Sequence, residues 1–188
     1  MADDLSQLTL EELWRLFPIF LVEHNPAWRR QYEAMADELS GLLAGFEVAR
    51  ISHIGSTAVD GIMAKDIVDI LVELPRRASM EAAAGVLERA GFTVMSAEGE
   101  RISLNRGYTP NGFADEVFHV HLRYAGDNDE LYFRDYLCEH PEVACEYETL
   151  KLSLWKRYEH NRDAYTEAKG DFIRSVTAEA KRVYAGRY

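Results

Sequence analysis

Two short stretches of this 188-residue chain carry side chains that could bind a phosphate group or a metal ion. The first, HIGSTAVDGIMAKDIVDILVEL at residues 53–74, contains Gly55, Ser56 and Thr57 between two apolar segments, and the second segment carries Asp69. Glycine lets backbone N–H groups approach a phosphate closely, and a serine hydroxyl can bind its oxygens. A tight turn capped by serine is the structural alternative, and the residues alone leave both interpretations open.

Asp69 is a single carboxylate inside a segment that reads as a buried strand. Its neighbours along the chain are Ile67, Val68, Ile70 and Leu71. A carboxylate in such a strand is costly unless it is paired or bound to a metal ion. Because buried and unpaired Asp is rare, the pattern favours a ligand role, with a structural salt bridge as the alternative.

His119 and His121 form the second stretch, in VFHVHLRY at residues 117–124. Side chains two apart on a strand share one face, and Arg123 is the next residue along that face. Two imidazoles and a carboxylate suit Zn, Mn, Fe or Ni better than Mg, which prefers oxygen ligands. If this strand lies beside that of Asp69, the three side chains predict a site for a divalent metal (Mn, Zn or Mg). The alternatives are a polar strand face or a histidine that simply hydrogen-bonds Asp69.

Four cationic residues are candidates for holding phosphate or another anion: Lys65, Arg101, Arg106 and Arg123. Lys65 precedes the strand of Asp69, and RISLNRG places Arg101 and Arg106 on one short strand and its end. Arginine binds phosphate and carboxylate groups in bidentate geometry. For each arginine the alternative is a solvated surface position, and Arg101 or Arg123 could instead pair with Asp69.

Hydrophobic periodicity predicts an α+β (α/β) fold, with one mixed β-sheet flanked by helices and a C-terminal helical tail. Helical spacing covers residues 9–22 (bent or broken at Pro18), 25–45, 80–91, 128–140, 141–159 and 161–184. Strand patterns cover residues 46–54, 66–74, 92–96, 101–107 and 117–124. Only about eleven residues connect the first two strands, which is short for a parallel crossover, so we expect them to be antiparallel neighbours.

Composition narrows the classes of function. The chain is 47% hydrophobic and 28% charged, as is typical of globular proteins, and its net charge is −11. Such a charge argues against a broad nucleic-acid surface but permits a small nucleotide held by a few cations. The acidic start MADDLSQLTL lacks the basic segment of a signal peptide. No apolar run is long enough for a membrane span, and the two cysteines are too few for a disulfide framework. We therefore expect a cytoplasmic protein, with no prediction for its oligomeric state.

Several of these motifs together resemble the GrpB family. The stretch at 53–74 is similar to the family's His-(hydrophobic)-Gly-Ser-Thr turn with its following Ala-Lys and Asp-Ile-Leu-Val. EHNPAWRRQYE resembles its first helix, FHVHL its His-x-His strand, and YFRDYLCEHPEVACEYETLK and RDAYTEAKGDFI its helical tail. The resemblance covers about residues 20–178. It predicts an N-terminal helical extension at 1–19 and a single GrpB-like domain at 20–188.

The resemblance implies a nucleotidyltransferase-like fold, in which a Gly-Ser turn contacts nucleotide phosphates and acidic residues bind a divalent metal. It implies a nucleotide or another phosphate-bearing small molecule as ligand, with Ser56 and Asp69 as catalytic residues if a nucleotidyl or phosphoryl group is transferred. Leu71 stands where such enzymes usually carry a second acidic residue. The alternative is a non-catalytic binding or accessory module, since GrpB-like domains also occur fused to dephospho-coenzyme A kinase. The sequence leaves open whether the protein is an enzyme.

Overall fold

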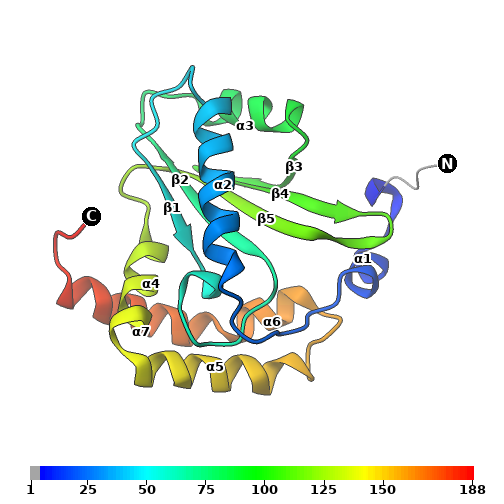
Figure 1. Ribbon diagram of the computed structural model, residues 1–188, viewed down its shortest axis with the longest axis vertical. Coiled ribbons are helices and arrows are strands. Elements are labelled where there is room, and N and C mark those ends of the chain that lie inside the picture. The colour runs from blue at the N-terminus through cyan, green and yellow to red at the C-terminus, as the bar shows by residue number, and fades with distance from the viewer. Residues whose placement is uncertain (1–4) are drawn as a thin grey trace.

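The chain folds around one mixed β-sheet that is packed by helices (Figure 1). The structure is a computed structural model and describes residues 5–188. Within that range the sheet has five strands in the order β1-β2-β5-β4-β3, in which β2 and β5 are parallel and the other neighbours are antiparallel. The strands are β1 (Arg50–Ile54), β2 (Val68–Leu74), β3 (Thr93–Glu98), β4 (Arg101–Thr109) and β5 (Gly112–Tyr124). The predicted antiparallel pairing of the first two strands is confirmed.

The helices follow the predicted segments, with one difference at each end of the chain. The helix predicted over 9–22 ends at Leu16, just before Pro18, and residues 17–22 are not helical. Of the helical extension predicted at 1–19, residues 1–4 lie outside the described range. The segment predicted as a single helix over 161–184 forms two helices that meet at Lys169 and Gly170, where glycine weakens helical continuity. None of the described helices is long and apolar enough to cross a membrane. The α-helices are α1 (Leu10–Leu16), α2 (Ala27–Leu42), α3 (Met80–Arg89), α4 (Asp129–Glu139), α5 (Pro141–Trp155), α6 (Arg162–Ala168) and α7 (Gly170–Val183), and the 3-10 turns are η1 (Leu5–Gln7) and η2 (Ser56–Ala58).

The main hydrophobic core lies between the sheet and helices α2 and α3. Alternate side chains of β2, including Ile70 and Val72, are fully buried there against Trp28 and Leu39 of α2 and Leu87 of α3. In Figure 1, α2 crosses in front of the sheet, and α3 lies near one end of it. Because strand side chains alternate, the residues between these apolar positions point to the opposite face, and Asp69 is one of them.

The C-terminal helices α4 to α7 pack below the sheet and hold the loop that follows β1 (Figure 1). Val59 and Ile62 of this loop are buried against Phe133 and Leu137 of α4 and Tyr147 of α5. The tail is therefore fixed against the loop between β1 and β2, and its side chains can contribute to any site near that loop.

A bulge at Gly107 changes the direction of side chains near the end of β4. The pairing of β4 with β5 shifts between Arg106 and Tyr108, and Gly107 has a φ of +100°. A Cβ atom on Gly107 would lie 2.4 Å from the backbone oxygen of Glu116, so only glycine fits this position. Bulges redirect strand side chains. Here the shift brings Tyr108 onto the face of the sheet that carries Asp69 and His119, where its hydroxyl contacts His119.

Candidate functional site

The Gly-Ser-Thr turn lies directly against Asp69. β1 ends at Ile54, which pairs with Asp69 of β2, and Gly55 follows with φ +72° and ψ −172°. A Cβ atom at Gly55 would lie only 2.6 Å from Oδ2 of Asp69. This backbone conformation is adopted almost only by glycine. Gly55 is therefore required both for the conformation of the turn and for its close approach to the carboxylate.

The turn and Asp69 share a pocket of about 200 Å³, which we call the turn–lysine pocket. The sheet side contributes the turn, Asp69 and the predicted Lys65, and the C-terminal helices contribute two lysines and two tyrosines. The pocket is lined by Leu21, Gly55, Ser56, Thr57, Lys65, Ile67, Asp69, Tyr147, Lys151, Tyr165 and Lys169. Lys151 and Lys169 were not among the predicted ligands, and they enter the site only because the tail folds back onto the loop.

Positive charge dominates the turn–lysine pocket. Of the charged residues that line it, three are lysines and one is Asp69. Burial, with repulsion from neighbouring cations, lowers the pKa values of Lys65 and Lys151 to about 7. Burial likewise lowers the pKa of Lys169 to about 8, although Asp69 opposes this effect. A bound anion would relieve this repulsion and favour the protonated lysines.

Asp69, His119 and His121 converge on the same face of the sheet, and we call these three residues the His–Asp centre. Oδ1 of Asp69 lies 3.2 Å from Nδ1 of His119 and 3.3 Å from Nε2 of His121. One ligand atom from each residue lies within 4.8 Å of the others. A tetrahedral ion with ligands at about 2.1 Å holds those ligands about 3.4 Å apart, close to the observed separations from Asp69. The donor set suits Zn or Mn better than Mg.

The protonation states of Asp69 and His119 also favour the binding of a metal cation. Burial raises the pKa of Asp69, but hydrogen bonds from His119 and His121 outweigh it and hold that pKa well below its usual range. Burial lowers the pKa of His119 to about 4, despite the opposing effect of Asp69. Asp69 is therefore an anion and His119 is neutral near pH 7, and these are the forms that bind metal ions.

Two hydroxyl groups hold the ring nitrogens that point away from Asp69. The hydroxyl of Tyr108 lies 3.0 Å from Nε2 of His119, and Oγ of Ser103 lies 3.2 Å from Nδ1 of His121. Arg162 of α6 also donates a hydrogen bond to the Tyr108 hydroxyl. Such outer contacts orient metal-binding histidines in known sites. Sequence reasoning missed Tyr108, Ser103 and Arg162, and only the glycine at 107 hinted at the bulge that brings Tyr108 here.

The three predicted arginines lie away from the turn–lysine pocket. Arg106 is on the α2 face of the sheet, where Nη1 lies 2.6 Å from Oε1 of Glu38. Arg101 pairs with Asp127 at 2.5 Å, and Arg123 is 6% exposed and donates to backbone carbonyl groups. Of the four predicted cations, the structure brings only Lys65 to Asp69.

Leu71 fills the position at which a second carboxylate would stand. It is fully buried and packs against Ile54 and Leu131 in a small apolar cluster. Glu73, further along the same face, is fully buried, and Oε2 accepts a hydrogen bond from Nε of Arg50 at 2.6 Å. Asp69 is therefore the acidic residue of β2 that remains available to a ligand.

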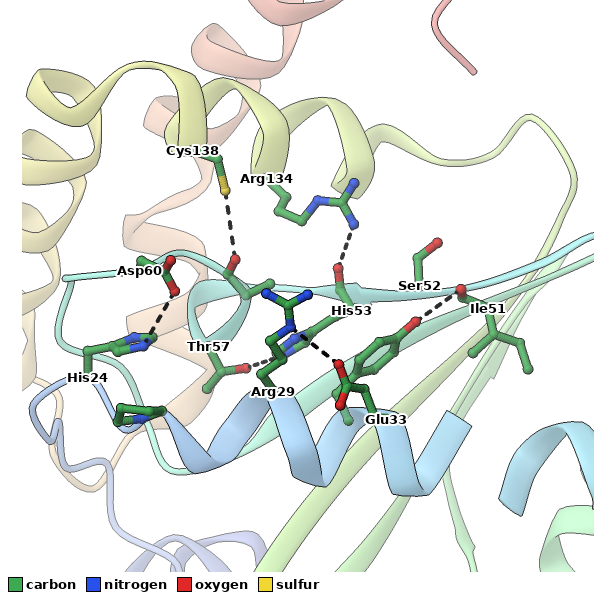
Figure 2. Close-up of a pocket in the computed structure, with 13 residues that line it drawn as sticks. His24, Arg29, Glu33, Ile51, Ser52, His53, Thr57, Asp60, Arg134 and Cys138 are labelled. Atoms are coloured by element: carbon green, nitrogen blue, oxygen red, sulfur yellow. Dashed lines mark hydrogen bonds and ion pairs between the residues drawn. The ribbon is translucent and has the colours of Figure 1, made fainter. Parts of the chain in front are cut away.

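A second, polar pocket of about 460 Å³ lies on the other side of the turn, between α2 and α4 (Figure 2). Thr57 lines both pockets, and its hydroxyl lies 2.9 Å from Nε2 of His53. The ring of His53 stacks on Tyr32 with centroids 4.8 Å apart, and Arg134 donates to the His53 carbonyl at 2.8 Å. Burial lowers the pKa of His53 to about 4. A neutral, stacked histidine thus supports the turn from the side opposite Asp69.

Comparison with known proteins assigns the family. Residues 18–179 match the family described as GrpB protein. The chain belongs to the GrpB family. The glutamate-rich protein GrpB of Alkalihalophilus pseudofirmus is 32% identical over 167 residues, which cover 86% of this chain and 95% of that protein. The UPF0157 protein YqkA of Bacillus subtilis is 30% identical over 97% of this chain, which spans about half (54%) of YqkA.

Solved structures support the same assignment and the fold. A GrpB crystal structure from Enterococcus faecalis aligns with a TM-score of 0.75 and 30% identity, over 88% of this GrpB chain and 99% of the other. The Cid1 poly(U) polymerase with MgGTP bound aligns with a TM-score of 0.50 over 76% of this chain and 44% of the polymerase. At 13% identity the second likeness concerns the fold alone. The predicted mixed α/β, nucleotidyltransferase-like fold is confirmed.

Proposed function

We propose that the turn–lysine pocket binds the phosphate groups of a nucleotide or of another phosphate-bearing small molecule. The observation that carries this proposal is the excess of lysines over carboxylates in a small pocket of a chain whose net charge is −11. Buried lysines whose charge is otherwise unfavourable gain most from an anion of several charges. The backbone of the turn and the Ser56 hydroxyl add hydrogen-bond donors at the same pocket.

The His–Asp centre would hold a divalent metal beside these phosphates. The fit rests on the two imidazole nitrogens that face Oδ1 of Asp69 and on the hydroxyl groups that hold the opposite nitrogens. When bound, the metal would neutralise charge on a phosphate oxygen. The chain's own part is to keep Asp69 ionised, to orient His119 through Tyr108, and to hold the phosphates with Ser56 and the lysines.

Binding without transfer is the second candidate function, and Leu71 favours it. A two-metal transfer site usually has a second carboxylate two residues after the first. At that position this chain has Leu71, a buried apolar side chain that cannot bind a metal ion. The chain is also 27% identical over 87% of its length to part of a dephospho-CoA kinase of Mycolicibacterium paratuberculosis. Release of phosphate or pyrophosphate from ATP with Mn²⁺ would favour the transferase. Saturable ATP binding without release of phosphate or pyrophosphate would favour the non-catalytic binding module.

A thermal-shift panel tests the proposed binding. Tripolyphosphate and the common nucleoside triphosphates, each with Mn²⁺, Zn²⁺ or Mg²⁺, should raise the unfolding temperature, because a ligand that binds only the folded state stabilises it. We expect larger shifts with Mn²⁺ or Zn²⁺ than with Mg²⁺. If no phosphate compound shifts the unfolding temperature at millimolar concentration, the proposal is wrong.

Replacing one pocket lysine should weaken phosphate binding measurably. We expect Lys169→Met to lower the affinity for tripolyphosphate about tenfold, which corresponds to about 1.4 kcal/mol. Calorimetry on Lys156→Met gives the matched control, because Lys156 is an exposed lysine just after α5 and outside the pocket. Equal affinities for wild type and Lys169→Met would remove Lys169 from the binding site.

Phosphate affinity should fall as the pH rises from about 7 to about 9. Burial lowers the pKa values of Lys65 and Lys151 to about 7 and of Lys169 to about 8, so these lysines lose protons over this range. A phosphomonoester keeps its charge there because its second pKa is about 6. Calorimetry with a phosphomonoester at several pH values measures how the logarithm of the affinity changes with pH, and this change is the slope. The slope should be shallower for Lys169→Met, and a flat profile for the wild type would contradict the assignment.

A further inference from the structure

A large cavity of about 680 Å³ lies beside the His–Asp centre, between α1 and strands β3 and β4. Its walls are mainly apolar and include Trp14 and Phe17 from the N-terminal segment and Met95 of β3. Met95 is 45% exposed, so part of this apolar wall is open to solvent. Asn105 and Tyr108 of β4 also line this cavity, which we call the aromatic groove.

Asn105 supplies a polar group in this apolar surface. It is only 8% exposed, and no hydrogen bond to its side-chain amide is made by any part of the chain that the structure describes. Its amide atoms are not among the fully buried side-chain atoms that lack a partner, so they are accessible from the groove. There the amide offers a ligand both a donor and an acceptor.

The groove and the turn–lysine pocket lie on the same face of the sheet. Asn105 pairs with His119 across β4 and β5, and His119 pairs with Asp69 across β5 and β2. Two inter-strand steps of about 4.8 Å thus separate the strand of Asp69 from that of Asn105, or about 10 Å. Tyr108, which lines the groove, contacts His119 at 3.0 Å. The His–Asp centre lies between the two cavities.

We propose that the aromatic groove holds the nucleobase of a nucleotide whose phosphates occupy the turn–lysine pocket. The proposal rests on the proposed function and narrows its ligand to a nucleoside di- or triphosphate. A base has apolar faces that aromatic side chains such as Trp14 can stack on, and these contacts contribute substantially to binding. It also has an edge of donors and acceptors that an asparagine amide can bind in bidentate geometry. A purely apolar group would leave the Asn105 amide unpaired.

Calorimetry with Mn²⁺ present tests this by comparing ATP, GTP, CTP and UTP with tripolyphosphate and dodecyl phosphate. We expect at least one nucleoside triphosphate to bind at least tenfold more tightly than tripolyphosphate. Asn105→Ala should remove most of this advantage and leave the tripolyphosphate affinity unchanged. Asn111→Ala is the matched control, because Asn111 is an exposed asparagine in the turn between β4 and β5. Trp14→Ala should weaken nucleotide binding in the same selective way.

The outcomes separate this inference from the proposed function. If tripolyphosphate binds as tightly as every nucleotide, phosphate binding stands and the nucleobase site is wrong. A dodecyl phosphate that binds more tightly than all four nucleotides would assign the groove to an apolar chain and overturn the inference. If the Asn105→Ala variant does not fold, the Trp14→Ala variant decides. The inference is wrong if that variant still binds the nucleotide as much more tightly than tripolyphosphate as the wild type does. If neither tripolyphosphate nor any of the four nucleotides binds, the proposed function fails, and the nucleobase site fails with it.

Discussion

The Asp69→Asn variant is expected to bind Mn²⁺ or Zn²⁺ at least about 100-fold more weakly than the wild type. Loss of a residue that only orients a metal ligand typically costs about 10–100-fold in affinity, and Asp69 would be a ligand itself. Asp69 is also the sole anion among the three residues of the His–Asp centre. Asparagine keeps the shape of the side chain, so the fold should remain. Calorimetry near pH 7 measures the change, because the low pKa of His119 keeps its ring neutral at that pH.

Asp127→Asn provides the matched control for this substitution. Asp127 is a carboxylate that pairs with Arg101 at 2.5 Å, outside the His–Asp centre. Its loss should leave metal affinity unchanged. If the wild type binds no divalent ion at millimolar concentration even with a nucleotide present, Asp69 is a structural residue held by two histidines. The non-catalytic module would then be the better account of this GrpB domain.

The part of the site that follows from strand geometry could be predicted from the sequence. The short connection between residues 54 and 66 predicts that β1 and β2 are antiparallel neighbours, and this pairing sets the turn against Asp69. Two-residue spacing predicts that His119 and His121 share a face. The position of β5 directly beside β2 could not be predicted, because no local pattern encodes which strands pair across the chain. The order of the strands in the sheet therefore decides whether the two histidines meet Asp69.

The residues that sequence reasoning missed depend on irregular backbone or on distant packing. In a regular strand Tyr108 would point to the same face as Arg106, and the bulge at Gly107 turns it toward His119 instead. Lys151 and Lys169 reach the pocket through the docking of the tail. The apolar stripes of the tail predict that it packs on the sheet and completes the wall of the pocket, but they do not specify which of its polar side chains enter the pocket.

The spacing of Arg101 and Arg106 in the sequence already shows that the two arginines cannot share one site. Arg101 and Arg106 are five residues apart, so in a regular strand they point to opposite faces and cannot both meet Asp69. The structure places Arg106 beside Glu38 on the α2 face and Arg101 beside Asp127. Strand periodicity alone is therefore sufficient to separate these two residues.

The second large effect is expected for Gly55→Ala, which should destabilise the fold and weaken both metal and phosphate binding. Gly55 has φ +72° and ψ −172°, a conformation that costs an L-residue about 1–3 kcal/mol. The new Cβ would also lie 2.6 Å from Oδ2 of Asp69, a distance that real Cβ atoms essentially never show, and 3.1 Å from Cβ of Asp69, which is tighter than most Cβ contacts. Either the turn or the carboxylate must move, and each movement separates phosphate donors from the metal ligand. Denaturant unfolding measures the free energy, and calorimetry with Mn²⁺ and tripolyphosphate measures binding.

Gly61→Ala distinguishes the close approach to Asp69 from the cost of a positive φ. Gly61 has φ +78° in the same loop, and a Cβ atom there would have no neighbouring atom of the described residues within 4 Å. Its substitution should therefore cost about 1–2 kcal/mol of stability and leave metal and tripolyphosphate affinities intact. Gly55→Ala should lose more stability than Gly61→Ala and at least about tenfold in affinity for each ligand, a factor that corresponds to about 1.4 kcal/mol. If the two variants bind equally well, contact between the turn and Asp69 contributes nothing to the site, and Gly55 serves only the conformation of the turn.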